Sequence, residues 1–538
     1  MLGRLPCDRR IERRANRIGR RIRLRDDLTT SPRTPDQPAQ PRVGPRDLAS
    51  VIRTSSRAEA HQRGSKKMSH TPLPSIPDDL RLSARLDRLP LTRNHVMWLI
   101  VLGIAMLIEV FDNTVFAYVA PSIRANWGMS IAEVGLITSA VFVGMLIGAL
   151  VGGNLSDRFG RRPVLIWGSV FYSLMSLVCA FAPNFEVLAV GRVLTGVGVQ
   201  AATGVLLVYA GEMFPRFARG RSLAVVTFLG FVGAPVTSLA ALAIAPTGVE
   251  AWRIVFGIGA AGLVIAIVAA LWLPESVRWL LINGKNSEAE RVVVGLERSA
   301  ARSGKPLGPL EADVPAPPRG SLRDLLRPDI LKRLIVTSVA FFLYIYCNYG
   351  FISWVPTILV DQGAAQADAL RFATVLSFST VAGPLLMFFV ADKIERKTTM
   401  LLASLLGAGS LVVFAFASDP TTSLVAGFGA QLGFSVMGVV LYTYVPEVFP
   451  TNVRGAGFGV VSGFARIAGI IAGVSVAAIY TGFGYQILYS VLAIGLLAAG
   501  IVAGVFGPKT TNRSLEAISD ASVLGEVSTE RTPNVRVR

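Results

Sequence analysis

The sequence predicts an all-α membrane protein with 12 transmembrane helices, arranged as two six-helix halves that an internal repeat relates. Of its 538 residues, 52% are hydrophobic and only 16% are charged, whereas soluble domains carry about 25% charged residues. Apolar runs of roughly 20 residues, the length of a helix that crosses a 30 Å hydrocarbon layer, recur along the chain. Two motifs also recur at one fixed offset, which is typical of duplicated transporter halves.

Each expected crossing is one such apolar run. In the first half, the runs cover 95–121, 131–153, 164–183, 186–210, 221–246 and 252–273. In the second half, they cover 332–358, 369–391, 398–417, 421–446, 455–481 and 485–507. The expected parts are therefore an N-terminal segment (68–94), an N-terminal bundle (95–273), a loop (274–331), a C-terminal bundle (332–507) and a tail (508–538).

Residues 1–67 form a basic leader of different composition. They hold 18 Lys and Arg against 7 Asp and Glu, and they lack the apolar core of a secretory signal peptide. Their Arg- and Pro-rich composition is typical of disorder. A basic tail can contact nucleic acid or anionic lipid. We instead expect the native protein to start at Met68, without this leader and without a nucleic-acid partner.

Lys and Arg in the short loops predict the orientation. One side carries Arg158, Arg161, Arg162, Arg216, Arg219, Arg221, Lys393, Arg396, Lys397 and Arg454. The other side carries only Arg124, Arg253 and Arg371. Because cytoplasmic loops are the basic ones, the first side is expected to face the cytoplasm. Both termini and the 274–331 loop then lie in the cytoplasm of a bacterial inner (plasma) membrane.

The 274–331 loop is expected to contain two amphipathic helices. Residues 287–304 carry apolar side chains on one side and charges on the other. Residues 321–333 open with Ser321 and Asp324, a pair typical of a helix start. A helical cytoplasmic plug and a simple linker on the membrane both fit this pattern.

The internal repeat has an offset of 235 residues. "YAGEMFPRFARG" begins at Tyr209 and "YVPEVFPTNVRG" at Tyr444. "DRFGRR" begins at Asp157 and "DKIERK" at Asp392. Separate motifs that share one offset indicate two halves of parallel topology.

These motifs resemble those of the major facilitator superfamily. "GNLSDRFGRR" at Gly153 fits its loop signature, and "EMFPRFARG", "PESVRWLL" and "EVFPTNVRG" resemble the sugar-porter branch. "RLDRLPLTRNH" and "FISWVPTILVDQG" are similar to the aromatic-acid:proton symporters and niacin-type carriers. The resemblance implies a transporter that works by alternating access, in which the first and fourth helices of each half line a central cavity.

Two departures narrow the substrate class. Sugar porters usually carry paired glutamines in the seventh helix, but residues 332–358 contain no Gln, which argues against sugar. "GFVGAPVTS" at Gly230 keeps only part of the drug/proton antiporter signature, which argues less strongly against drug efflux.

Four ionisable residues fall inside expected crossings, where each costs about 2.5–3.5 kcal/mol. In the first half, Asp112 and Arg192 are expected at similar depth, at about 13 and 9 Å from the outer helix ends. The first helix resembles the acidic element that couples protons in relatives. If the two charges meet in one state and separate in another, the affinity of Asp112 for a proton alternates. The competing interpretation is a static buried ion pair. Glu109 is expected to act as a proton relay or to point outward.

The second half holds the candidate substrate contacts. Arg466 lies at mid-depth and either binds a substrate carboxylate or pairs with Glu109 or backbone oxygens. The 332–358 crossing carries the aromatic residues Phe341, Phe342, Tyr344, Tyr346, Tyr349, Phe351 and Trp354. Of these, Tyr346 and Trp354 are candidates for stacking on a planar substrate, although an interfacial belt explains most such residues. Asn348, beside a discontinuity expected from Gly350 and Pro356, is the candidate hydrogen-bonding group.

Paired acids and arginines at the cytoplasmic helix ends are the candidate gate. They are Asp157, Arg161, Glu212 and Arg219 in the first half, and Asp392, Arg396, Glu447 and Arg454 in the second. In relatives such groups tie the halves together while the carrier opens outward. Topology-setting charge explains the arginines but does not explain acids that recur at the same offset.

No enzymatic motif, cofactor site or metal-ligand spacing stands out, and the three cysteines are scattered. The sequence predicts a monomeric carrier in the lipid bilayer that imports a small organic solute, such as an aromatic acid, with protons. The alternatives are a drug/proton antiporter, a sugar or metabolite uniporter, and a membrane sensor that does not transport.

Overall fold

The computed structural model describes residues 78–309, 322–391, 393–508 and 510. The leader 1–67, the middle of the 274–331 loop, Asp392 and the end of the tail lie outside these residues. The described residues form helices joined by short connections, with no strand among them.

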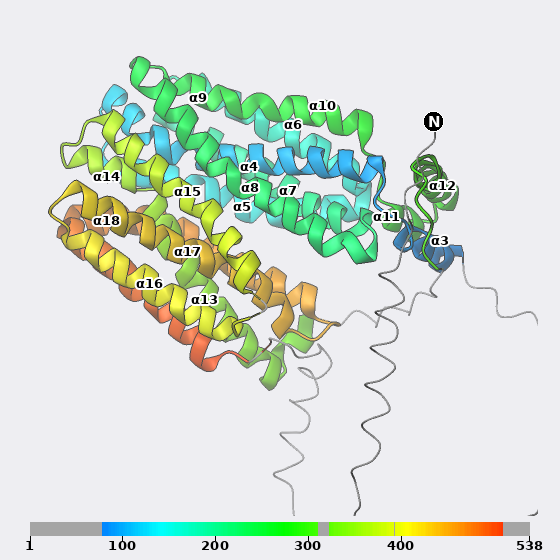
Figure 1. The fold of residues 1–538 in the computed structure, drawn as a ribbon. Helices are drawn as coiled ribbons and strands as arrows, with labels where there is room; N and C mark the ends of the chain where they lie inside the picture. Colours follow the sequence, from blue (N-terminus) through cyan, green and yellow to red (C-terminus); the bar gives the residue numbers. More distant parts are fainter. Residues whose placement is uncertain (1–77, 310–321, 392, 509, 511–538) are drawn as a thin grey trace, which may run out of the picture. The chain divides into compact units, whose positions relative to one another are not determined.

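Helices α4 to α10 build the first half (Figure 1). They are α4 (Arg93–Trp127), α5 (Ile131–Phe159), α6 (Arg161–Ala180), α7 (Phe185–Met213), α8 (Arg216–Ile244), α9 (Trp252–Ile258) and α10 (Gly262–Trp272). A 3-10 turn at Gly259–Ala261 joins α9 to α10, so that these two form one crossing. All six expected crossings of this half are present, several extended by a few residues.

Helices α13 to α18 build the second half. They are α13 (Pro328–Ile352), α14 (Val355–Asp361), α15 (Gln366–Val390), α16 (Arg396–Phe416), α17 (Pro420–Val448) and α18 (Arg454–Ile501). The apolar stretch Arg454–Phe506 is 53 residues long, about twice what one crossing needs. Gly484 breaks it with a φ of 82°, which glycine adopts readily, so α18 contains two crossings. Counted so, the eleven apolar segments among the described residues give twelve crossings, and the predicted fold is confirmed.

Two local expectations are corrected or refined. A single surface helix over 321–333 was expected, but a 3-10 turn at Leu322–Leu326 is followed directly by α13. Pro328 explains the difference, because proline favours the first turn of a helix and holds Arg327 in an extended conformation (ψ 136°). The expected discontinuity near Pro356 is present as the gap between α13 and α14.

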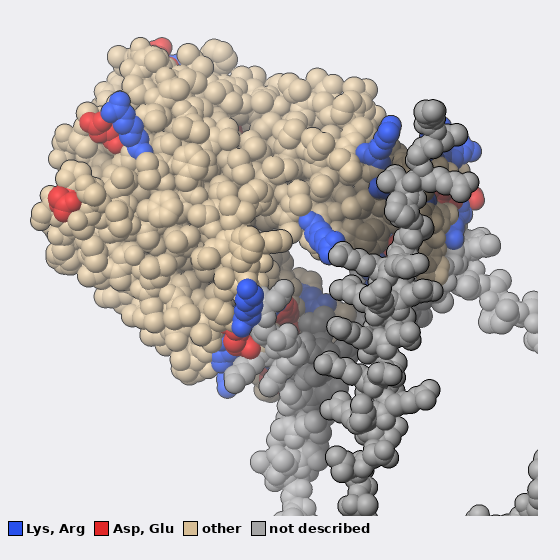
Figure 2. Space-filling view, viewed as in Figure 1, with Lys and Arg blue, Asp and Glu red and all other residues tan. Residues whose placement is uncertain are grey.

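We call the end of the bundles where α4 begins and α5 ends the basic end. Two short helices that the sequence did not predict, α3 (Asp78–Asp87) and α11 (Val277–Ile282), lie there with the expected α12 (Asn286–Arg302). Figure 2 shows charged side chains mainly toward the ends of the bundles, with a broad surface of other residues between them. Such a surface suits a hydrocarbon layer, because charge is costly inside it.

Close helix contact holds the first half together. Gly144, Gly148 and Gly152 are spaced four residues apart on α5 and lie against the backbone of α7. A Cβ on Gly152 would lie 2.6 Å from the Cα of Ala201, so no side chain fits there. Lipid supplies no hydrophobic force between helices, and small residues that allow close approach are what stabilise such pairs.

Ion pairs hold α3 against α12. Glu297 accepts from Arg85 at 2.7 Å and from Arg88 at 2.9 Å. Hydrogen bonds from these arginines, Arg85 first, lower the pKa of Glu297 below its ordinary 4.5. Asp87 of α3 also pairs with Arg219 of α8 at 2.9 Å. The N-terminal segment is therefore tied both to the loop helix and to the membrane bundle.

The α5–α7 contact gives a matched pair of variants. We expect Gly152→Leu to lower the stability by at least about 2 kcal/mol, because α5 and α7 must separate. Gly153→Leu should be tolerated, since a Cβ there meets nothing within 4 Å. Thermal unfolding of the purified proteins measures both, and equal melting temperatures for the two variants would contradict this packing.

The α3–α12 contact should depend on pH. Because the folded-state pKa of Glu297 is depressed, its stabilising contribution is present above pH 4.5 and is lost as pH falls below it. Hydrogen exchange of α3, corrected for the intrinsic pH effect, should rise on this acidification. Glu297→Gln should exchange fast in α3 at pH 7 and show no further rise. Equal protection of α3 in both proteins at pH 7 would contradict the role of Glu297.

Candidate functional site

A buried arginine and a buried aspartate lie at the centre of the first half. Asp112 on α4 and Arg192 on α7 are 0% and 1% exposed, and Arg192 Nη1 lies 3.7 Å from Asp112 Oδ2. The same guanidinium donates to the main-chain oxygens of Asp112 at 3.1 Å and Asn113 at 3.3 Å. Arg192 is therefore held mainly by backbone oxygens, and its contact with the carboxylate is long for an ion pair.

Ser176 on α6 is a partner of Asp112 that the sequence analysis missed. Its hydroxyl donates to Asp112 Oδ1 at 2.5 Å, whereas Oδ2 accepts no hydrogen bond from the described residues. Only the i, i+3 spacing of Ser173 and Ser176 in an apolar helix could have suggested a polar face there. Three helices thus meet at this carboxyl group, and one of its oxygens is left with Arg192 alone.

Glu109 occupies a separate environment one turn away on α4. It is 1% exposed and accepts from the hydroxyl of Thr203 on α7 at 2.6 Å. Its other oxygen has no hydrogen-bond partner, and no Lys or Arg of the described residues lies within 4 Å of it. The side chain faces α7 inside the bundle, so the expectation of an outward-pointing Glu109 does not fit this structure.

A small cavity joins this centre to the second half. Arg192, Asn113 and Phe142 line it from the first half, and Tyr349 lines it from α13. Its volume is about 20 Å³, roughly the space that one water molecule needs. Asn113 Nδ2 donates to the Tyr349 hydroxyl at 3.4 Å, so the two halves touch beside Arg192. A solute larger than water enters this space only if the halves move apart.

The predicted substrate contacts do not line this cavity. Tyr346 pairs with Ser475 of α18 at 2.9 Å, and Trp354 is fully buried within the second half. Asn348 is half-buried on α13. Arg466 reaches across to Met145 Sδ at 3.8 Å, and it does not pair with Glu109. Instead, Tyr349 is the aromatic residue of α13 that lines the cavity, and no feature of the sequence separated it from its neighbours.

The candidate gate charges pair within their own halves. Arg161 contacts Asp157 at 3.0 Å and Glu212 at 3.2 Å, and Arg396 contacts Glu447 at 2.8 Å.

The remaining gate candidates are placed as follows. Arg219 pairs with Asp87 and not with Glu212, Arg454 donates to Thr451 at 3.1 Å, and Asp392 lies outside the described residues. Glu275, which accepts from the main-chain N–H of Arg161 at 2.9 Å, was missed although it belongs to the quoted "PESVRWLL". In this structure the candidate gate residues therefore stabilise each half separately and do not join the two halves.

The two halves are joined at the opposite end. Arg124 of α4 pairs with Asp361 of α14 at 2.7 Å, and Asp361 also accepts from the Tyr480 hydroxyl at 2.6 Å. Gln366 donates to Ser122 at 2.5 Å. Between described residues, the side-chain hydrogen bonds and ion pairs that join the halves lie at this end and at mid-depth. The arrangement is that of a carrier closed at this end.

Twelve crossings in two similar halves, with buried charges beside their interface, define a multi-pass membrane transporter. The family described as "Sugar (and other) transporter" matches residues 91–521, and the chain belongs to this family. Its relatives are transporters and not enzymes.

Similar proteins cover most of the chain. It is 30% identical over 437 residues to the Bacillus subtilis (strain 168) protein named "Putative metabolite transport protein YyaJ", which covers 80% of this chain and 96% of that protein. It is 29% identical to the niacin transporter NiaP of Acinetobacter baylyi, over 81% of this chain and 99% of that one. A solved structure of the xylose transporter XylE from E. coli matches with a TM-score of 0.63 at 18% identity, covering 78% of this chain and 99% of that one, which supports the fold.

The buried pair predicts that substituting Arg192 alone destabilises the protein more than substituting Arg192 and Asp112 together. Arg192→Gln should lower the stability by about 3–5 kcal/mol, because it leaves the Asp112 carboxylate buried without a cation. The double variant Arg192→Gln/Asp112→Asn should recover part of this loss. Thermal unfolding in detergent measures the cycle, and a double variant less stable than Arg192→Gln would contradict the pairing.

Proposed function

We propose that this transporter is a proton-coupled symporter that imports a small organic acid by alternating access. It acts as a monomer in the bacterial inner membrane, with both termini in the cytoplasm. The observation that carries the proposal is the carboxyl group of Asp112, fully buried, 3.7 Å from Arg192 and with one oxygen that accepts no hydrogen bond from the described residues. A group so placed can gain or lose a proton without breaking a tight ion pair.

Protonation of Asp112 is proposed to be coupled to the movement of the two halves through the residues around Arg192. A proton on Asp112 cancels its attraction for Arg192, which keeps its bonds to the oxygens of Asp112 and Asn113. Asn113 is the residue that contacts Tyr349 of the second half. Protonation therefore acts on the same turn of α4 that touches the other half. A proton shifts the equilibrium between two conformations only if one of them binds it more tightly. The contact between Asn113 and Tyr349 changes when the halves separate, and this change can alter the proton affinity of the neighbouring Asp112.

The second half supports an acidic substrate. Arg466 is half-buried near mid-depth, and no carboxylate of the described residues lies within 4 Å of it. A cation at such a depth costs about 2.5–3.5 kcal/mol, which a substrate carboxylate would offset. Relatives named for niacin, 4-hydroxybenzoate and gallate fit this chemistry, because all three compounds are aromatic carboxylic acids.

The remaining candidates belong to the same half as Arg466. Tyr346 and Asn348 lie on α13, which packs against α18, the helix that carries Arg466. Trp354 is fully buried and contacts a solute only after the second half rearranges. The gate pairs of Arg161 and Arg396 are proposed to exchange partners across the basic end when the carrier opens outward.

Uptake assays test the coupling. Thermal-shift measurements with nicotinate, 4-hydroxybenzoate, gallate and xylose first identify a compound that binds. We expect Asp112→Asn in proteoliposomes to abolish uptake of that compound driven by a pH gradient, because the proton site is lost, and to retain exchange of labelled for unlabelled compound.

Asp368→Asn is the matched control. Asp368 is exposed, and among the described residues its ion pair is with Arg371 of its own helix, so this variant should transport normally. Uphill uptake by Asp112→Asn would contradict proton coupling at this residue. Binding of xylose alone among the four compounds would favour a sugar uniporter, and expulsion of the compound against a proton gradient would favour antiport.

A further inference from the structure

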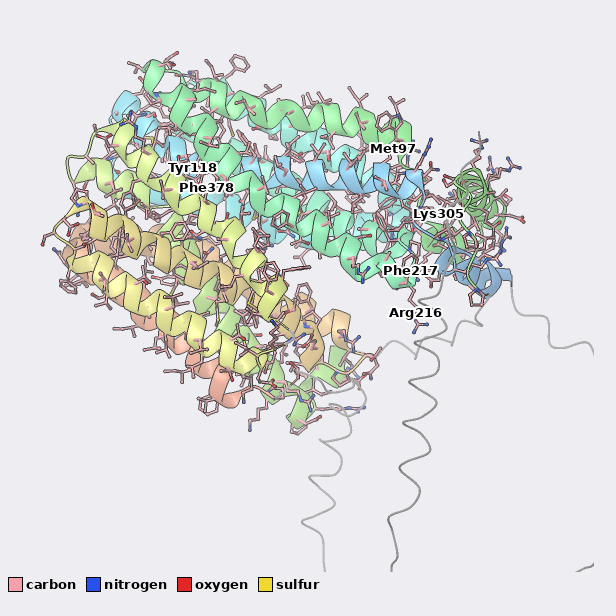
Figure 3. The ribbon with its side chains drawn as sticks, viewed as in Figure 1. Met97, Tyr118, Arg216, Phe217, Lys305 and Phe378 are labelled. Carbon is pink, nitrogen blue, oxygen red and sulfur yellow. The ribbon has the colours of Figure 1, made fainter. Side chains whose placement is uncertain are left out.

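A basic cavity lies at the basic end, outside the centre that carries the proposed transport function. It has a volume of about 430 Å³ and lies between the start of α4 and the segment that follows α12. Arg93 lines it from α4, and Arg302 and Lys305 line it from the other side. Figure 3 labels Met97, near the start of α4, and Lys305, which follows α12, at this end of the bundle.

The charge of this cavity is not compensated by the described part of the chain. Arg93, Arg302 and Lys305 are all exposed, and no carboxylate of the described residues lies within 4 Å of any of them. Lys305 donates one hydrogen bond, to the main-chain oxygen of Leu91 at 2.7 Å, and its other N–H groups donate to no described residue. The nearby acid of α12, Glu297, is bound by Arg85 and Arg88.

An apolar strip leads from the cavity along α4. Val96 lines the cavity and is 50% exposed, and Ile100 and Ile104 follow at four-residue spacing with 52% and 40% exposed. Residues at this spacing share one helix face. The strip therefore runs from three cations into the membrane-spanning part of α4, which matches a ligand with an anionic head and an apolar chain.

We propose that this cavity binds the phosphate of an anionic phospholipid in the adjacent leaflet, with its acyl chain along Val96, Ile100 and Ile104. Basic pockets at the ends of membrane helices bind such headgroups, and each basic residue contributes about fivefold to affinity. Because the headgroup would bridge Arg93 to Arg302, it would fasten the loop helix α12 to the first membrane helix. The same cations could bind free inorganic phosphate, so the experiment must distinguish a lipid phosphate from a free one.

Lipid binding to the full-length protein tests this site. Native mass spectrometry and thermal unfolding are compared in nanodiscs of phosphatidylcholine and in nanodiscs that also contain phosphatidylglycerol. We expect phosphatidylglycerol to raise the melting temperature and to remain bound. Arg93→Gln/Arg302→Gln should bind it about 30-fold more weakly, because two cations are lost.

Arg291→Gln/Arg298→Gln is the matched control, since both residues are exposed on α12 and neither lines the cavity. It should keep the affinity of the wild type for phosphatidylglycerol. Stabilisation by inorganic phosphate in phosphatidylcholine nanodiscs, lost in Arg93→Gln/Arg302→Gln, would support the phosphate site and assign it to free phosphate. Equal binding of phosphatidylglycerol by both double variants would overturn the proposal. None of these outcomes depends on whether Asp112 couples protons.

Discussion

The high free energy of charge in a hydrocarbon layer shapes the centre of this protein. Arg192 cannot face lipid, and it is held by two main-chain oxygens of α4 and by the carboxylate of Asp112. This cluster ties α4 to α7, and Ser176 adds α6. The turn of α4 that accepts these bonds is also the turn whose Asn113 touches the second half. One of the contacts between the two halves therefore lies beside the ion pair that ties α4 to α7.

The internal repeat preserves the fold and the charges at the helix ends, but not the charges inside the crossings. The residue 235 positions after Asp112 is Cys347, and the one after Glu109 is Tyr344, both buried and uncharged. The residue 235 positions after Arg192 is Gly427. Since a buried charge destabilises a helix bundle unless it is compensated, duplication alone does not retain it. The two halves thus share a scaffold, and among the described residues the fully buried acids, Glu109 and Asp112, lie in the first half.

The contacts between the halves are also asymmetric. At the end opposite the basic end, Arg124 and Asp361 link α4 to α14 directly. At the basic end, Arg161 and Arg396 bind acids of their own halves. Arg161 is buried and Arg396 is half-buried, so each needs an acidic partner in every state, because a buried charge left unpaired is costly.

The sequence alone determined the twelve crossings and the repeat, because hydrocarbon thickness fixes helix length and duplication fixes the offset. It also singled out Asp112 and Arg192, since charges inside apolar runs are conspicuous. It did not find Ser176, Tyr349 or Asp361, because a serine, a tyrosine or an end-of-helix aspartate looks the same whichever side it faces. Which side faces the partner half is set by helix rotation and packing, and only the tertiary structure decides these.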